Sequence, residues 1–209
     1  MLASLVAAFS GPAAAFMYAL LVVAAFGLAV VVERAWSFAR YNVDPDTLLA
    51  RAREAVPKGE LLGGDTSSPV AHVVSAGVAQ AAAGSPPDTC WDAMTAAAIE
   101  ADLQVRQRVG YLSMIASVAT MIGLFGTVYG LILAFGALGD ASAAQRAARL
   151  GEGSATAMST TAFGLLVAIP ALAAHSVAEA RVRVLLARIE ATAARLLVIL
   201  QEARRAQGA

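Results

Sequence analysis

Long apolar runs without charge dominate the pattern of this sequence. No charged residue precedes Glu33, and further uncharged runs cover residues 109–139 and 153–178. Each run can cross a hydrocarbon core of roughly 30 Å, where a backbone must satisfy its own hydrogen bonds within a helix. The pattern therefore predicts an all-α integral membrane protein. The expected transmembrane helices cover residues 12–32, 111–138 and 154–177.

Turn and capping residues divide the segment 33–110 into shorter helices. Asp44 and Pro45 predict the start of one short helix, and a second is expected over 69–83. After Asp88 no proline or other breaker occurs before the next loop, so we expect one continuous helix of about 50 residues. Apolar residues continue at helical spacing beyond the third span. The second and third helices are therefore predicted to extend into a cytoplasmic helical bundle.

The arginines indicate how the chain is oriented. They follow the first and third spans and precede the second, whereas the loop at 139–153 holds two arginines that two acidic residues offset. Under the positive-inside rule, the N-terminal segment 1–11 and the 139–153 loop lie outside. Residues 33–110 and 178–209, a C-terminal helix, then lie in the cytoplasm.

The end of the first span carries residues typical of a membrane interface. Glu33 and Arg34 form a charged pair, and the ring of Trp36 can sit beside them at the level of the headgroups. We interpret these three residues as interface anchoring rather than as catalytic groups.

Composition narrows the possible functions further. Of the 209 residues 59% are hydrophobic and 14% charged, and the net charge is zero, so nothing favours binding to nucleic acid. The single cysteine, Cys90, excludes an intramolecular disulfide and is expected to be a small buried or interfacial residue. Nucleotide-binding loops, histidine pairs at ligand spacing and nucleophile motifs are absent from the sequence. We expect no enzyme, no cofactor and no metal site.

Small residues form a ridge on the second span. Gly126 and Gly130 are four residues apart, and Gly123 and Ala134 extend the ridge, a spacing that allows close helix approach in membranes. Thr127 lies within it. Its hydroxyl can bond back to its own helix or face a polar path, and the sequence leaves both interpretations open.

The third span is rich in hydroxyl groups, which can pass protons or hold water but cannot store a proton at neutral pH. No Asp or Glu lies inside any predicted span. If protons cross here, the titrating carboxylate must come from another chain. The hydroxyl-bearing residues are Ser154, Thr156, Ser159, Thr160 and Thr161.

Two motifs resemble a known family. The stretch from Gly123 to Gly130, GLFGTVYG, is similar to the second-helix motif of ExbB and TolQ. The stretch from Thr160 to Pro170, TTAFGLLVAIP, is similar to their third-helix motif, and the residues 33–36 at the end of the first span also fit. The chain thus resembles the MotA/TolQ/ExbB proton channel family.

The resemblance implies a homopentamer in the bacterial inner membrane that encloses two copies of a single-span ExbD-, TolR- or MotB-like protein. The partner's membrane aspartate would accept protons, and proton flow would drive rotation. The chain would be the proton-conducting ring subunit of a rotary motor that uses the proton motive force for mechanical work. The resemblance places Thr127 and Thr161 in the proton pathway, and the third-span hydroxyls of Thr160 and Thr156 are predicted to join it. Helix packing and partner-helix contact would involve Gly123, Gly126, Gly130, Gly164 and Pro170.

One position departs from the ExbB and TolQ pattern. Those proteins carry a glutamate five residues before the third-helix threonine, where this chain has Thr156, and the nearest acid is Glu152. The departure favours a motility or gliding stator, although the three-span length resembles ExbB and TolQ. A poorly conducting structural scaffold of such a complex, or an unrelated small transporter bundle, remains an alternative.

Overall fold

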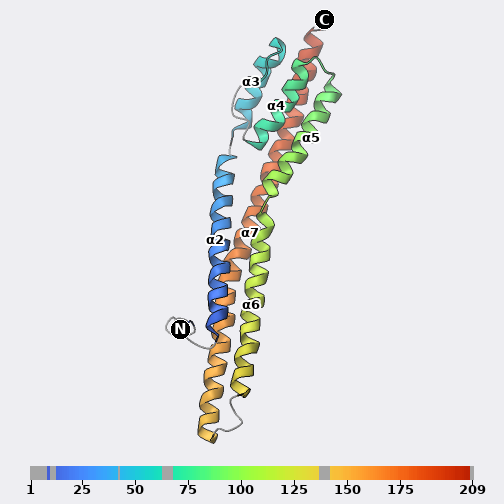
Figure 1. Ribbon diagram of the computed structural model, residues 1–209. Coiled ribbons are helices and arrows are strands. Elements are labelled where there is room, and N and C mark those ends of the chain that lie inside the picture. Colours follow the sequence, from blue (N-terminus) through green and yellow to red (C-terminus); the bar gives the residue numbers. More distant parts are fainter. Residues whose placement is uncertain (1–8, 10–12, 42, 63–67, 137–141, 208–209) are drawn as a thin grey trace. The chain divides into compact units, whose positions relative to one another are not determined.

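The computed structural model describes residues 9, 13–41, 43–62, 68–136 and 142–207, and every regular element among them is helical (Figure 1). Residues 1–8 and 10–12 of the expected N-terminal segment and first span, residues 137–138 of the second span and residues 139–141 of the expected loop lie outside these ranges. The helices are α2 (Ala14–Arg40), α3 (Pro45–Ala55), the 3-10 helix η1 (Val56–Lys58), α4 (Pro69–Ala82), α5 (Pro87–Arg106), α6 (Val109–Gly136) and α7 (Ala143–Gln207).

Three stretches are long and apolar enough to cross a membrane. They are α2, the stretch Pro87–Gly136 that contains α5 and α6, and the stretch Gln145–Ala206 within α7. The prediction of an all-α membrane protein with three spanning helices is confirmed.

The helix expected to continue from Asp88 through the second span is interrupted. α5 ends at Arg106, α6 begins at Val109, and Arg108 between them has a φ of 64°. A residue other than glycine adopts this left-handed conformation rarely and at a cost. Side chains of α2 contact both residues of the break, as described below, so tertiary contacts override the local helix propensity.

The third membrane helix begins earlier than expected. α7 starts at Ala143, so most of the expected 139–153 loop is helical. The Ser142 side chain accepts a hydrogen bond from the Gln145 N–H (3.4 Å), and the Gln145 side chain accepts one from the Ser142 N–H (3.0 Å). This reciprocal capping box satisfies two backbone donors that would otherwise lack partners at the start of the helix.

The prediction of a short helix beginning at Asp44 and Pro45 is confirmed. The Asp44 carboxylate accepts a hydrogen bond from the Asp46 N–H at 3.2 Å, and Pro45 is the first residue of α3. Proline suits this position because the first-turn N–H would have no helical partner.

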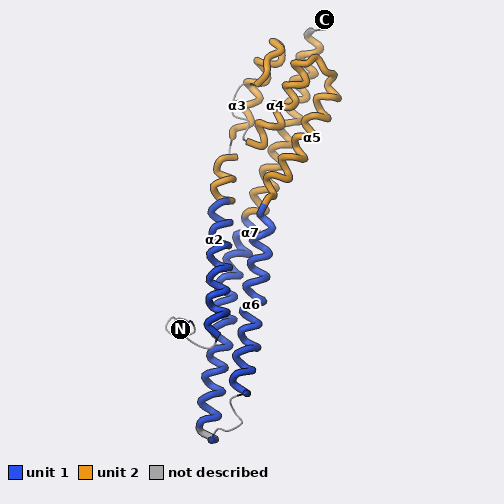
Figure 2. Tube along the Cα trace, in the orientation of Figure 1, with its two compact units in different colours: residues 1–33, 108–177 blue, residues 34–107, 178–209 orange. Residues whose placement is uncertain are grey.

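The chain forms two compact units (Figure 2). Unit 1 comprises the described residues of 1–33 and 108–177, that is, most of α2, α6 and the first part of α7. Phe16 of α2 packs edge-on against Phe125 and Tyr129 of α6, with ring centroids 5.5 and 5.2 Å apart. Met17, Leu20 and Leu112 are among its fully buried side chains.

Unit 2 comprises the described residues of 34–107 and 178–209 and has its own apolar core. A Cβ atom built on Gly77 of α4 would lie 2.7 Å from the Met94 sulfur of α5 and 3.0 Å from a Leu196 methyl of α7, so glycine lets these helices approach. The fully buried core side chains of unit 2 include Val70, Val73, Val74, Val78, Met94, Val105, Ile189 and Leu196.

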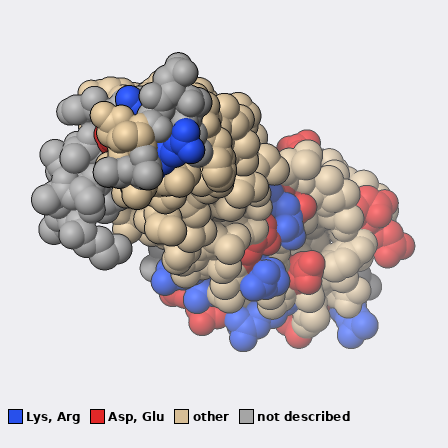
Figure 3. Space-filling model, turned by 90° about the horizontal axis from the view of Figure 1, so that it is seen from below, with Lys and Arg blue, Asp and Glu red and all other residues tan. Residues whose placement is uncertain are grey.

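Figure 3 shows acidic and basic side chains gathered on one part of the molecular surface and a broad uncharged area on another.

Candidate functional site

The glycine ridge of α6 is the surface on which α7 packs in unit 1. Gly123, Gly126 and Gly130 are all buried. A Cβ atom built on Gly126 would lie 2.7 Å from Thr160 Oγ1, and one built on Gly130 would lie 3.2 Å from Ala157. The first distance is shorter than real Cβ atoms tolerate, so glycine is what allows the close approach at Gly126.

α7 presents small residues in return. A Cβ atom built on Gly164 would lie 2.8 Å from the carbonyl oxygen of Ala119, and one built on Gly153 would overlap Ala134. Ala157 is also buried, with 2% of its surface exposed. The sequence prediction included Gly164 but missed Gly153 and Ala157. Their four-residue spacing is the same signal that marks the ridge on α6.

Two threonine hydroxyls meet between α6 and α7. Thr127 Oγ1 and Thr161 Oγ1 are in hydrogen-bonding contact, and each lies 3.2 Å from the carbonyl oxygen of Gly123. Thr127 Oγ1 also lies 3.4 Å from the carbonyl oxygen of Ala157. A hydroxyl has one proton to donate, so one threonine can donate to Gly123 while the other donates to its threonine partner. Both side chains are half-buried. Thr127 therefore bonds back to its own helix and also faces α7.

Of the other two threonines of the predicted pathway, Thr160 shares the Ala157 carbonyl oxygen with Thr127, and Thr156 bonds elsewhere on α7. Thr160 is fully buried against Gly126, and its hydroxyl donates to the carbonyl oxygen of Ala157 at 2.8 Å. The hydroxyl of Thr156 donates to the carbonyl oxygen of Glu152 at 2.9 Å. Pro170, predicted to take part in helix packing and partner-helix contact, lies inside α7 and is exposed.

A cavity of about 210 Å³ lies beside Thr156, between α6 and the first turns of α7. It has room for several water molecules. Charged side chains of both signs line the cavity together with small and apolar residues, so it can bind water or other small polar molecules. The lining residues are Gly130, Leu133, Ala134, Arg149, Glu152, Gly153 and Thr156.

The paired hydroxyls and the glycine ridge lie within a stretch that matches a family model. Residues 65–191, more than half of the chain, match the model of the MotA/TolQ/ExbB proton channel family. The chain belongs to this family. Membership accounts for the two motifs, and the matched stretch includes α4, α5, α6 and much of α7.

Individual relatives within the MotA/TolQ/ExbB family match shorter stretches. The Tol-Pal system protein TolQ of Haemophilus influenzae is 44% identical over 78 residues, covering 37% of this chain and 34% of the relative. A putative biopolymer transport protein, ExbB-like 2, of Helicobacter pylori is 40% identical over 75 residues, covering 36% and 49% respectively. The biopolymer transport protein ExbB of Salmonella typhimurium is 31% identical over 90 residues, covering 43% and 36%. The matches thus span between a third and a half of these relatives' lengths.

The three predicted anchoring residues of this family member have different surroundings. Trp36 is 63% exposed, as an interfacial ring would be. Arg34 is buried, and its guanidinium donates to the carbonyl oxygen of Gln107 at 2.8 Å. Glu33 accepts from Arg108 at 2.5 Å. Glu33 and Arg34 thus hold the break between α5 and α6, a role that sequence reasoning missed because their partners are more than 70 residues away.

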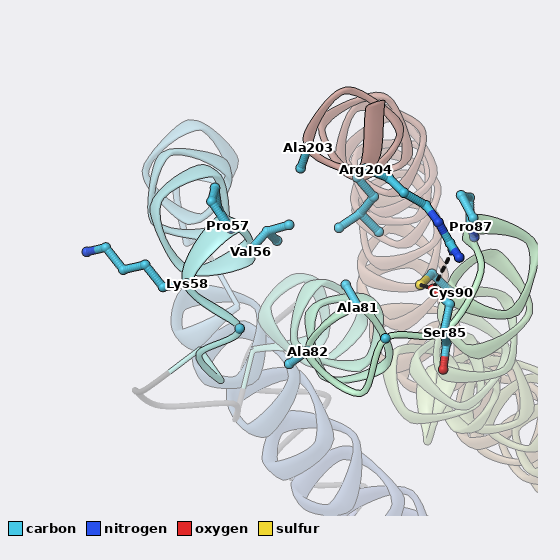
Figure 4. Close-up of a pocket in the computed structure, with 13 residues that line it drawn as sticks. Val56, Pro57, Lys58, Ala81, Ala82, Ser85, Pro87, Cys90, Ala203 and Arg204 are labelled. Carbon is cyan, nitrogen blue, oxygen red and sulfur yellow. Dashed lines mark hydrogen bonds between the residues drawn. The ribbon is translucent and has the colours of Figure 1, made fainter. Parts of the chain in front are cut away.

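A second cavity, of about 430 Å³, lies in unit 2 (Figure 4). Arg204 reaches toward Ser85 and Cys90 and donates to the carbonyl oxygen of Ser85 at 3.0 Å, while Lys58 points away. Cys90 is 1% exposed, which agrees with a small buried residue. Among the described residues, no three His, Cys, Asp or Glu side chains gather as metal ligands.

Proposed function

We propose that this chain is the proton-conducting ring subunit of a bacterial inner-membrane complex that turns the proton motive force into mechanical work. Five copies enclose two copies of a single-span ExbD-, TolR- or MotB-like partner. The N-terminus lies outside and the C-terminus in the cytoplasm. The complex serves as an ExbB- or TolQ-like energiser, or as a motility or gliding stator. The named relatives are a Tol-Pal system protein and biopolymer transport proteins, which supports the energiser.

The contact between Thr127 and Thr161 carries this proposal. Two hydroxyls that touch across a helix pair can each donate and accept, so they can solvate a carboxylate or a proton at the same level of the membrane. They cannot hold a proton themselves at neutral pH. The partner's aspartate therefore supplies the titrating group, and the threonines present it with polar contacts inside an apolar surrounding.

A poorly conducting scaffold is the second candidate, and a specific observation favours it. The carbonyl oxygen of Gly123 lies 3.2 Å from both hydroxyls, so the two threonines can satisfy one another and the backbone without any partner. In that case they clasp α6 to α7 and the ring transmits force without passing protons. Replacing the hydroxyls separates the two candidates.

The test replaces the paired hydroxyls with methyl groups of nearly the same shape. Thr127→Val and Thr161→Val should each lower proton flux by about ten- to hundredfold, the loss expected when a hydrogen bond to a charged group disappears. Flux is measured in vesicles that contain the complex purified through this chain, with a pH-sensitive dye inside and an imposed membrane potential.

Thr120→Val is the matched control. Thr120 lies on the same helix, but its hydroxyl bonds only to the carbonyl oxygen of Ala116, at 2.9 Å, among the contacts recorded for it. This variant should conduct normally, and Thr127→Ser, which keeps the hydroxyl, should retain most of the flux. Unchanged flux in the Thr127→Val, Thr161→Val double variant, with the complex intact, would reject the assignment of the two threonines to the pore. Flux no faster than that of protein-free vesicles in the parent complex would support the scaffold.

A further inference from the structure

One face of α2 is apolar and exposed along its length. Tyr18, Val22, Val32 and Trp36 are 55, 68, 60 and 63% exposed. Their spacing places all four on one side of the helix, because positions four, fourteen and eighteen residues after Tyr18 each lie within about 40° of it, so that the four share a sector of about 80°. The ring of Phe9 packs edge-on against Tyr18 at one end of this face, with ring centroids 5.4 Å apart. The other three side chains are more than half exposed, and the length of the face matches a hydrocarbon core.

At the end of this face, the guanidinium of Arg40 lies over the ring of Trp36. Arg40 follows Trp36 by four residues, and its guanidinium carbon lies 5.0 Å from the centre of the Trp36 ring. A guanidinium over an indole face is attracted by the ring and keeps its N–H donors at the edge available. On α2, the exposed apolar residues are therefore followed by the positively charged guanidinium of Arg40.

Arg40 differs from the other arginines near the ends of the first and second spans. Arg34 donates to Gln107 and Ser37, Arg106 pairs with Asp102 and Glu179, and Arg108 pairs with Glu33. Among the described residues Arg40 has no acidic partner, and its recorded contact is the Trp36 ring. Its positive charge is thus uncompensated within this part of the protein.

We propose that Trp36 and Arg40 bind the headgroup phosphate of an anionic phospholipid such as phosphatidylglycerol. The apolar face of α2 holds the acyl chains, the indole lies against the glycerol region, and the guanidinium donates to the phosphate. A planar guanidinium matches two phosphate oxygens at once, and an anionic lipid leaves no competing ammonium beside them. The lipid comes from the leaflet predicted to be cytoplasmic. This site is independent of proton conduction.

The fluorescence of Trp36 reports which lipid lies beside it. The chain has two tryptophans, so Trp91→Phe leaves Trp36 as the only indole. The full chain is reconstituted in phosphatidylcholine vesicles with phosphatidylglycerol, and one of the two lipids carries brominated acyl chains that quench fluorescence. At equal mole fraction, brominated phosphatidylglycerol should quench Trp36 more strongly, with a preference of about fivefold, the value of one cation at a membrane surface.

Variants of Arg40 test whether this residue provides the preference for phosphatidylglycerol. Arg40→Gln should reduce the ratio of quenching by the two brominated lipids to about one, while Arg40→Lys should keep most of the preference. Arg53→Gln is the matched control, because Arg53 is exposed on α3 of the same unit, and it should keep the full preference.

Several results would overturn the proposal. Equal quenching by the two lipids in the parent chain, or a full preference in Arg40→Gln, would show that Arg40 does not select a headgroup. Loss of the preference on adding inorganic phosphate would identify a free anion as the ligand instead. Absence of quenching by either lipid would mean that protein, such as a second copy of the chain, covers this face.

Discussion

At the scale of single residues, Gly164 and Ala119 set how closely α6 and α7 can pack. The carbonyl oxygen of Ala119 would lie 2.8 Å from a methyl group on Gly164, and that oxygen belongs to rigid helical backbone. The contact cannot relax by rotating a side chain. The helices would have to separate, which would also pull Thr161 away from Gly123.

Gly164→Ala should therefore destabilise unit 1 by about 1–3 kcal/mol, the usual cost of overpacking. The thermal unfolding midpoint of the detergent-solubilised chain measures this loss. Gly110→Ala is the matched control, since a Cβ atom on Gly110 of α6 meets nothing within 4 Å. It should leave the midpoint unchanged or raise it slightly, because alanine favours helix more than glycine. Equal midpoints for the two variants would contradict a tight contact at Gly164.

The residues of the ridge could be predicted, but their pairings could not. The four-residue spacing of Gly126 and Gly130 is enough by itself to indicate close packing. The contact of Thr127 with Thr161, rather than with Thr160, depends on the rotation and register of α6 against α7. Neither helix encodes that register alone, and the family resemblance was what singled out this pair.

At the scale of helices, the break between α5 and α6 depends on α2. The carbonyl oxygen of Gln107 accepts a hydrogen bond from the buried guanidinium of Arg34 at 2.8 Å. This contact anchors the C-terminal end of α5, where carbonyl groups have no helical partner. The break could not be predicted from the sequence because Gln107 and Arg108 carry no breaking signal.

Arg34→Met should loosen the last turn of α5. A hydrogen bond from a charged donor contributes about 1.5–3 kcal/mol, so the amide protons of residues 103–106 should exchange about ten- to hundredfold faster. Hydrogen–deuterium exchange followed by mass spectrometry measures this change. Arg51→Met, at an exposed position of α3, is the control and should leave exchange in α5 unaltered. Unaltered exchange in Arg34→Met would show that the break does not need this donor.

Other helix boundaries were open to prediction from local chemistry. Asp44 and Pro45 identified the start of α3, because a cap and a first-turn proline act within four residues. Ser142 and Gln145 form a comparable local signal for the start of α7, although they lie before the uncharged run that marks the third span. Hydropathy identifies the apolar part of a helix, whereas capping residues identify its ends.

At the scale of the whole molecule, the chain lacks an acid within its predicted spans. On the proposed function, conduction must then depend on the partner. The chain reconstituted alone should pass protons no faster than protein-free vesicles. Flux should appear when the single-span partner is included and disappear when the partner's membrane aspartate is changed to asparagine. Rapid flux through the chain alone would contradict this dependence.

The left-handed residue Arg108 also has an electrostatic consequence for the second span. Because α6 begins its own hydrogen-bond ladder at Val109, it has its own macrodipole, equivalent to roughly half a positive charge at its first turn. In an uninterrupted helix that charge would lie some twenty residues away, at the start of α5. The carboxylate of Glu33, 2.5 Å from Arg108, stands at this end of α6 with the opposite charge. The break thus brings the positive end of the α6 macrodipole to Val109, beside the Glu33 carboxylate that offsets it.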